Sequence, residues 1–136
     1  MTKSIPGTTC VVEATTPYAN DDGRISAQAS VWDCSQDSPI IYVCSVEEKK
    51  SVSSTGTVTW TAVAGSRSCY PETSTDFGGQ TANATPSAAG VYRQRAQAAI
   101  TLNATTWTPA QPSTCGTLAS NVPCKFMEVV SGNVTL

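Results

Sequence analysis

Apolar and polar residues alternate along several short stretches of the chain, which is the pattern of strands with one buried face. In residues 24–31 the apolar side chains occupy every second position, so they share one face of a predicted strand. Residues 57–62 repeat the pattern, with Val58, Trp60 and Ala62 expected to point inward and three threonines outward. The alternation therefore predicts two half-buried strands.

Other stretches depart from strict alternation. Residues 39–46 are mostly apolar on both faces, which suits a central strand, and the charged residues 47–50 are expected to form a solvated hairpin flank or one helical turn. Residues 91–102 alternate and predict a strand, although the good helix formers at 94–99 leave a helix as the alternative. A last strand is predicted over residues 125–130.

Two turns and one irregular segment separate these strands. The segments 20–23 and 53–56 each end in glycine and contain residues that favour turns. The first turn joins predicted strands at 9–16 and 24–32, and the second follows the central strand. Residues 70–90 hold several glycines and prolines, so they predict a long, irregular, surface-exposed segment.

Six cysteines in a short chain predict disulfides and an oxidising compartment. A zinc site is the competing interpretation, but the chain has no histidine and no Cys-x-x-Cys pair. Spacing alone leaves many pairings open. The two predicted hairpins bring the first four cysteines into pairs, so that the expected disulfides are Cys10–Cys34, Cys44–Cys69 and Cys115–Cys124.

The composition is that of one folded domain. Of the 136 residues, 13% are charged and 40% hydrophobic, and threonine and valine, which favour strands, are abundant. Together with the cysteines, this predicts an all-β fold, a disulfide-stapled immunoglobulin-like β-sandwich of about seven short strands. Residues 1–8 are expected to be an N-terminal extension and residues 9–136 a single domain.

The expected location is extracellular or at the cell surface, because disulfides persist in oxidising compartments. The first residues lack the apolar core of a signal peptide, so we expect that a leader has been removed and that Met1 belongs to a mature or recombinant form. Sequons at Asn83, Asn103 and Asn133 would carry glycans in a eukaryotic secreted protein. No apolar run has the length of a membrane span.

Several kinds of chemistry are excluded or disfavoured. The net charge of -2 provides no basic surface for nucleic acid, and the absence of histidine excludes Ser-His-Asp and Cys-His catalysis. The sequence contains no phosphate-binding or dinucleotide-binding motif, so we expect no cofactor, and no metal site. Carboxylate pairs such as Asp33 with Asp37, or Glu72 with Asp76, leave glycoside hydrolysis as a minor alternative to a protein without enzymatic activity.

Aromatic residues in or near predicted loops are candidate contact points for a partner. Tyr70, Phe77 and Trp107 would be anchors for a protein or a sugar on a rigid scaffold, or would instead cover the ends of the sandwich. Thr117 and Leu118 lie in the loop that the third predicted disulfide closes. Because a loop that is rigid beforehand loses less entropy on binding, these two residues are also candidates for partner contact.

The stretch Tyr92-Arg93-Gln94-Arg95-Ala96, followed by Thr106-Trp107 and the closing cysteine pair, resembles small secreted proteins of actinomycetes with immunoglobulin-like domains. The resemblance is confined to the last third of the chain. Such proteins act as extracellular adaptors, inhibitors or subunits of secreted assemblies. The resemblance therefore implies a role of that kind and assigns no functional residue.

The leading hypothesis is a non-enzymatic extracellular binding or assembly module, such as an adaptor or structural subunit of a secreted or surface assembly. A protein partner or self-assembly is expected, and the polar ends 1–8 and 131–136 are expected to pair with an edge strand of a neighbour. The alternatives are a proteinaceous inhibitor of a secreted enzyme and a carbohydrate-binding or adhesive module that uses Trp107 and Tyr70.

Overall fold

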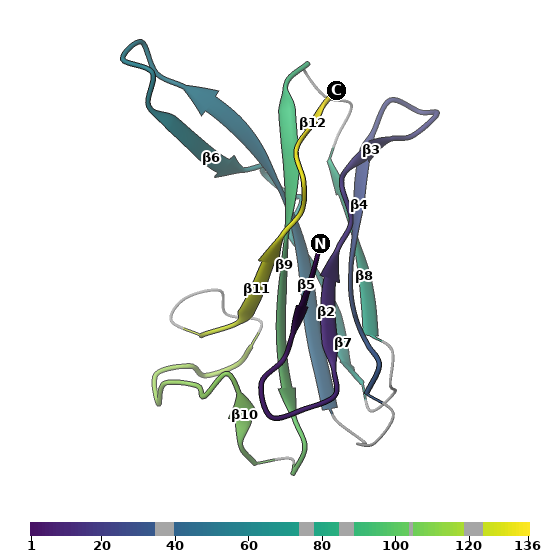
Figure 1. Ribbon diagram of the computed structural model, residues 1–136, viewed down its shortest axis with the longest axis vertical. Coiled ribbons are helices and arrows are strands. Elements are labelled where there is room, and N and C mark those ends of the chain that lie inside the picture. Colours follow the sequence, from purple (N-terminus) through teal and green to yellow (C-terminus); the bar gives the residue numbers. More distant parts are fainter. Residues whose placement is uncertain (35–39, 74–77, 85–88, 104, 119–123) are drawn as a thin grey trace.

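A computed structural model of the chain describes residues 1–34, 40–73, 78–84, 89–103, 105–118 and 124–136, with the backbone alone for 70–73 and 78–84. Within these ranges the chain forms twelve strands and no helix. The strands lie in two antiparallel sheets that pack face to face (Figure 1). The predicted all-β sandwich is confirmed.

The first sheet is built around one central strand. Its strands are β1 (Thr2–Ser4), β2 (Val11–Ala14), β3 (Tyr18–Ala19), β4 (Ile25–Trp32) and β8 (Gly78–Ala84). The central strand β4 pairs with β2 and β3, and it pairs with β8 over seven consecutive positions. The edge strand β1 pairs with β2.

The second sheet is built around two long strands. Its strands are β5 (Ile40–Val52), β6 (Val58–Ala62), β7 (Ser68–Thr73), β9 (Val91–Thr101), β10 (Trp107–Thr108), β11 (Met127–Val130) and β12 (Val134–Thr135). Strands β5 and β9 pair over ten consecutive positions. Strands β6 and β7 flank β5, and β10, β11 and β12 flank β9.

The order of the main strands is that of an immunoglobulin-like sandwich. In such folds strands A, B and E are neighbours in one sheet and strands G, F and C in the other. Here β2, β4 and β8 are neighbours in the first sheet, and β11, β9 and β5 in the second, with β7 beside β5 in the place of strand C′. The remaining segments, β1, β3, β6, β10 and β12, extend the edges.

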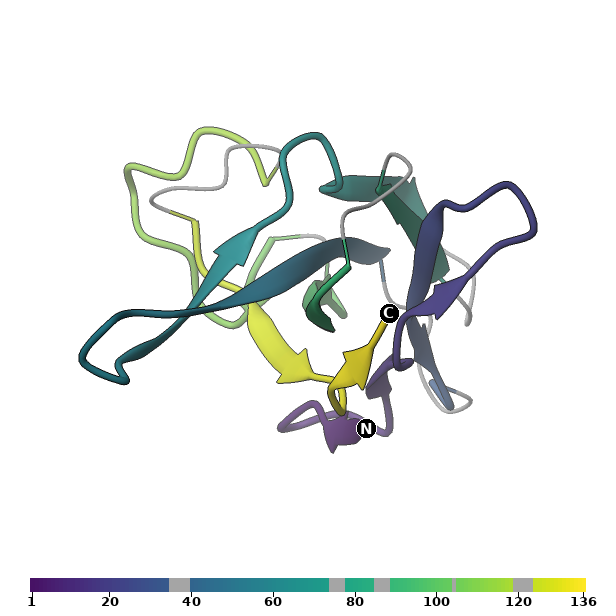
Figure 2. The same cartoon turned by 90° about the horizontal axis from the view of Figure 1, so that it is seen from above.

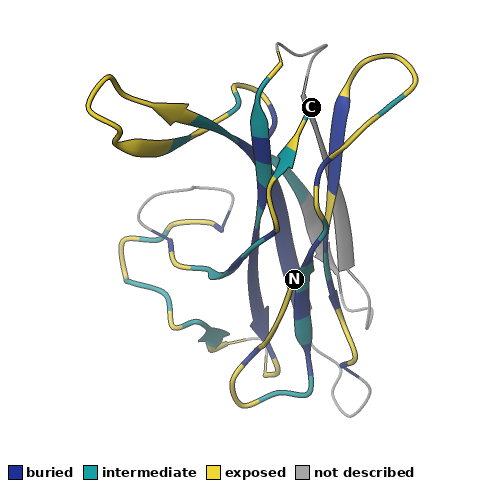
Figure 3. Cartoon of the chain, turned by 45° about the horizontal axis from the view of Figure 1, so that its top comes forward, coloured by how far each residue is buried: buried dark blue, intermediate teal, exposed yellow. Residues whose placement is uncertain are grey.

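The main hydrophobic core lies between the two sheets, where alternate residues of the facing strands meet (Figure 3). Most of its side chains are small or β-branched, which suits close packing of two pleated surfaces. Its wholly buried members include Val12, Ala29, Val31, Ile41, Val43, Ala98 and Ile100.

The first residues of the chain are part of the sandwich. The Met1 amino group donates a hydrogen bond to the carbonyl oxygen of Ala14 (3.0 Å), and Ile5 is buried in the main core. Residues 1–8 were expected to pair with the edge strand of a neighbour. In the structure their strand β1 pairs with β2 of the same chain.

Both predicted hairpin turns are confirmed. Gly23 and Gly56 have φ angles of 81° and 84°, in the left-handed region that glycine adopts without strain. The Gly23 N–H donates to the carbonyl oxygen of Asn20, and the Gly56 N–H donates to that of Ser53, each at 3.0 Å. The first turn connects β3 to β4, and the second connects β5 to β6.

The hairpin of β5 and β6 projects from the body of the sandwich (Figures 1 and 2). Val58 is 48% exposed, Ala62 is exposed and Trp60 is half-buried. The prediction that these three residues point inward is therefore wrong. Alternation identified the strand and the residues that share a face, but the hairpin extends past the region where the second sheet faces the first.

Residues 47–50 continue strand β5 into the β5–β6 hairpin, so they are a hairpin flank, as one of the two predictions had it, and not a helical turn. The prediction that this flank is solvated is wrong for its first two residues. Glu47 is wholly buried and Glu48 is 8% exposed. They lie in the segment where β5 pairs with β9 on one side and approaches β6 on the other. Pairing on both edges holds these charged residues in a strand despite their low strand propensity.

The prediction that residues 70–90 are irregular is also wrong in part, because this segment contains the end of β7 and all of β8. Strand β8 is rich in Gly, Ala and Asn, residues that seldom favour strands. Its backbone nevertheless completes the other edge of β4, so sheet pairing overrides local preference. Residues 91–101 form a strand, as predicted, rather than the alternative helix.

The three predicted disulfides, Cys10–Cys34, Cys44–Cys69 and Cys115–Cys124, are all present. The first is wholly buried between the sheets. The second joins neighbouring strands at directly opposite positions, because Cys44 of β5 is in register with Cys69 of β7. The third closes the short loop that follows β10.

Removal of the buried disulfide is expected to destabilise the protein strongly. The Cys10–Cys34 bond closes a loop with a sequence separation of 24, and a loop of this size corresponds to about 3.5 kcal/mol in the chain-entropy model. We expect C10S/C34S to lower the free energy of unfolding in urea by at least this amount. C115S/C124S, with a separation of 9, should cost about 2.7 kcal/mol. A larger loss for C115S/C124S would contradict this expectation.

Candidate functional site

The outer face of the second sheet carries its own small hydrophobic cluster. Tyr42, Cys44 and Ala99 of β5 and β9 are buried there beneath Leu118 and the third disulfide. The Tyr42 and Phe126 rings stack with their centroids 6.4 Å apart. The loop after β10 therefore covers this face of the sheet, and the two central strands are buried on both faces.

One glutamine fixes this loop to the chain segment that leads into β11. The Gln111 amide donates from Nε2 to the carbonyl oxygens of Lys125 (2.6 Å) and Pro109 (3.1 Å), and its Oε1 accepts from the Lys125 N–H (2.8 Å). Within the loop, the Cys115 N–H donates to the carbonyl oxygen of Pro112 (2.9 Å). Hydrogen bonds and the disulfide thus hold the loop together.

A depression of about 230 Å³ opens between the loop and β10, and we call it the Trp107 depression. Its lining consists of Trp107, Gln111, Cys115, Gly116, Thr117 and Leu118. Trp107 is half-buried, Leu118 is 6% exposed, and Gly116 and Thr117 form an exposed rim. Strand β10 positions Trp107 by pairing it with Thr101 of β9.

The structure brings together three of the five predicted contact residues, namely Trp107, Thr117 and Leu118. Leu118 is a buried anchor of the loop rather than a presented side chain. The backbone of Tyr70 lies in β7, in register with Val43, and its side chain is not among those described. Phe77 lies outside the described residues.

Sequence reasoning missed two residues of the depression. Gln111 was not singled out, and only its position between two prolines could have suggested that it is tied to the backbone. Gly116 was not singled out either, and a Cβ atom added there would meet nothing within 4 Å. Both line the depression together with Trp107.

The chemistry of the Trp107 depression is that of contact rather than of proton transfer. Among the described residues that line it, none has an ionisable side chain. It offers an indole ring and a disulfide as apolar surface, with an amide and a hydroxyl group beside them. Such a surface suits contact with an apolar side chain.

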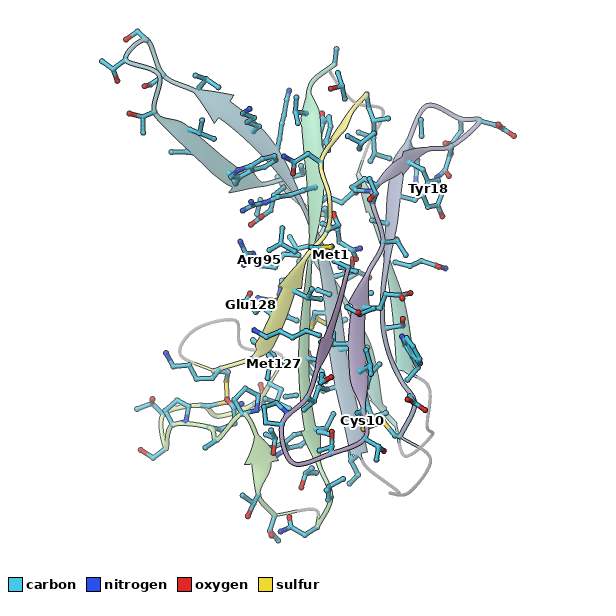
Figure 4. All side chains as sticks on the ribbon, viewed as in Figure 1. Met1, Cys10, Tyr18, Arg95, Met127 and Glu128 are labelled. Atoms are coloured by element: carbon cyan, nitrogen blue, oxygen red, sulfur yellow. A yellow bond between two sulfur atoms is a disulfide. The ribbon has the colours of Figure 1, made fainter. Side chains whose placement is uncertain are left out.

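A second hollow, of about 360 Å³, lies on the same outer face near the projecting hairpin. Glu48 accepts hydrogen bonds from Arg93 Nε (2.8 Å) and Arg95 Nε (3.1 Å), and Glu128 lies 3.7 Å from Arg95 Nη1. Arg95 and Glu128 extend from β9 and β11 to the same side (Figure 4). Gln97 Nε2 donates to Glu128 (3.1 Å). These contacts neutralise most of the charge on this surface.

The arginines and glutamates of this hydrogen-bonded network stabilise one another's charged forms. Burial by itself would lower the pKa of the Arg95 guanidinium, but its hydrogen bonds with Glu48 and Glu128 and their negative charges outweigh that effect and raise the pKa. Arg93 also lies over the Trp60 ring, with its guanidinium carbon 4.2 Å from the ring centroid. The network therefore holds the base of the β5–β6 hairpin to β9.

Polar groups also occur between the sheets. The Gln94 amide of β9 donates from Nε2 to the carbonyl oxygens of Thr15 and Gln28 in the first sheet, each at 2.8 Å. Its Oε1 accepts a hydrogen bond from Ser45 of β5. The neighbouring Glu47 carboxyl is wholly buried, and neither of its oxygens has a hydrogen-bond partner among the described residues.

The buried Glu47 carboxyl should make stability depend on pH. Burial raises its pKa from 4.5 to about 7. Between these values the folded chain keeps a proton on Glu47 that the unfolded chain releases, so the contribution of Glu47 to stability is greatest below pH 4.5 and falls as the pH rises towards 7. The expected fall is about 3 kcal/mol.

Denaturation in urea at a series of pH values checks this expectation. Glu47→Gln removes the titrating group, so the difference in unfolding free energy between the two proteins should change across that pH range. All other groups titrate equally in both proteins and cancel in the difference. Parallel stability curves would show that the Glu47 carboxyl does not bind its proton more tightly in the folded state.

The remaining predicted sites are only partly described. Asp33 has a left-handed backbone with φ of 64°, as at a turn, while Asp37 and Asp76 lie outside the described residues and the side chain of Glu72 is not described. The described residues contain no group of three side chains placed to hold a metal ion. None of their segments is a helix long and apolar enough to cross a membrane.

Comparisons with known proteins find a distant structural similarity. No protein-family profile and no curated protein matches the chain. A similar solved structure is the ASH/PapD-like domain of human CEP192 (PapD-like domain 7), with 14% sequence identity and a TM-score of 0.44. The alignment covers 96% of this chain and 87% of that one. We therefore assign the immunoglobulin-like fold from the strand order of this chain and not from that similarity.

Proposed function

We propose that the chain is a non-enzymatic extracellular binding module that holds a protein partner at the Trp107 depression. The observation that carries this proposal is the meeting of Trp107, Thr117 and Leu118 around one hollow beside the third disulfide. Aromatic residues at the centre of a contact and in a rigid setting contribute most to protein–protein affinity.

The rigidity of the loop supports this role. The Cys115–Cys124 bond, the Gln111 hydrogen bonds and the buried Leu118 restrain it before any partner arrives. A loop that is already ordered loses little conformational entropy on binding, so more of the contact energy contributes to affinity. The same rigidity would serve an inhibitor of a secreted enzyme, which is one specific form of the proposal.

Three disulfides support an extracellular setting, because such bonds persist in oxidising compartments. The lining of the depression supports a binding role over an enzymatic one, since its described residues offer no acid or base. A carbohydrate partner is the second candidate, because a half-exposed indole also stacks on sugar rings. Capture from the secretome would identify a protein partner, whereas a glycan array would identify a carbohydrate partner.

The test is the capture of partners from the native secretome under non-reducing conditions, followed by affinity measurement with the purified partner. Gly116→Arg should block the depression without disturbing the fold, because Gly116 is exposed and a side chain there has open space. We expect it to raise the dissociation constant at least about tenfold, and Trp107→Ala to do the same.

Trp32→Ala is the matched control, because Trp32 is a partly exposed tryptophan on β4 of the other sheet. It should leave the dissociation constant unchanged. A partner that binds the Gly116→Arg and Trp107→Ala variants as tightly as the wild type would contradict the proposed site. Binding to a glycan array, with no protein captured, would favour the carbohydrate alternative instead.

A further inference from the structure

Strand β6 has a free edge. Among the described residues it pairs with β5 alone. The Val63 N–H donates to the backbone carbonyl of Glu47, and the Ser53 N–H donates to the backbone carbonyl of Thr57. These two bonds fix which residues of β6 are hydrogen-bonded to β5. Because bonded and unbonded residues alternate in an antiparallel pair, the backbone groups of Val58, Trp60 and Ala62 point away from β5. Among the described residues, the N–H and C=O groups of these three residues have no strand partner.

This edge lacks the usual protection against pairing. Natural edge strands carry lysine, proline or a bulge, which prevent another chain from adding to the sheet. Residues 57–62 contain no charged residue, no proline and no glycine, and valine, threonine and tryptophan favour strands. The hairpin projects from the body, and its residues 51–62 are exposed apart from the half-buried Trp60, so another strand can approach it (Figures 2 and 3).

The sequence of this edge is close to a palindrome. Residues 57–63 read Thr-Val-Thr-Trp-Thr-Ala-Val, with Trp60 at the centre. Trp60 has one threonine on each side, at 59 and 61, followed by a small apolar residue on each side, at 58 and 62, and a β-branched residue on each side, at 57 and 63. A strand that reads nearly the same in both directions is complementary to an antiparallel copy of itself, since a two-fold axis exchanges its two halves.

We propose that two copies of this chain associate by antiparallel pairing of their β6 strands about a two-fold axis at Trp60. The pairing joins the two hairpins into one four-stranded sheet, β5–β6–β6–β5. This association does not depend on the Trp107 depression, which lies on another part of the molecule.

The register follows from the parity of the ladder. Trp60 faces its own counterpart in the second copy, and Val58 faces Ala62 of the second copy, in hydrogen-bonded pairs. Thr59 faces Thr61 of the second copy in a non-hydrogen-bonded pair, where side chains lie closest. Aromatic pairs and threonine pairs directly across a ladder are both favourable. Trp60 is already oriented by Arg93, so it loses little freedom on pairing.

The test uses two double variants at exposed positions. Thr59 and Thr61 are exposed and lie on the face of the hairpin opposite Trp60. In T59E/T61E, glutamates of the two copies face one another across the axis and repel. In T59K/T61E, each lysine faces a glutamate of the second copy and attracts it. Both variants place the same glutamate beside Lys49 of their own chain, so the hairpin itself is matched.

Sedimentation equilibrium of the full chain, with its disulfides intact, measures the association. We expect the wild type and T59K/T61E to form dimers, and T59E/T61E to remain monomeric at the same concentrations. The Trp60 amide should exchange its hydrogen more slowly in the dimer than in the T59E/T61E monomer, because pairing gives it an acceptor.

Three results would overturn the proposal. The wild type could remain monomeric at concentrations up to about 1 mM. T59E/T61E could dimerise as well as the wild type, which would place the interface elsewhere. T59K/T61E could lose the dimer together with T59E/T61E, which would exclude the two-fold register about Trp60.

Discussion

The structure depends on the ladder between β5 and β9, which joins ten consecutive positions from Ile40 with Thr101 to Lys49 with Tyr92. Both strands carry apolar side chains on both faces, so the ladder needs a cover on each side. The first sheet covers one face, and the disulfide-closed loop after β10 covers the other. The Trp107 depression exists because this second cover is a loop, which packs less evenly than a sheet.

Buried polar groups stabilise a sandwich where they find hydrogen-bond partners. The Gln94 amide satisfies this condition by bonding to the backbone of the first sheet, and so it ties the two sheets at one register. The Glu47 carboxyl, two residues along β5 from Ser45, lacks such partners among the described residues. The same narrow space therefore holds one polar group that strengthens the sandwich and one that weakens it at high pH.

Features that depend on local sequence were predictable, and those that depend on distant pairing were not. Alternation identified β4, β6 and β9, the glycines at 23 and 56 located two turns, and the hairpins paired the cysteines. Strand β8 was not predicted, because its residues have low strand propensity and form a strand through pairing with the edge of β4. The burial of Glu47 and the exposure of β6 likewise depend on where the first sheet ends. Trp107 and Thr117 were recognised singly, but their meeting needs the loop that Leu118 anchors.

The placement of the disulfides also determines how the chain would respond to mechanical tension. A pull on the two ends acts first on the terminal strands β1 and β12, which are held by short pairings with β2 and β9. The Cys10–Cys34 bond then stops the unravelling, because force passes through the sulfur atoms and bypasses the residues between them. The other two bonds act in the same way. A large share of the chain is thus protected from stretching.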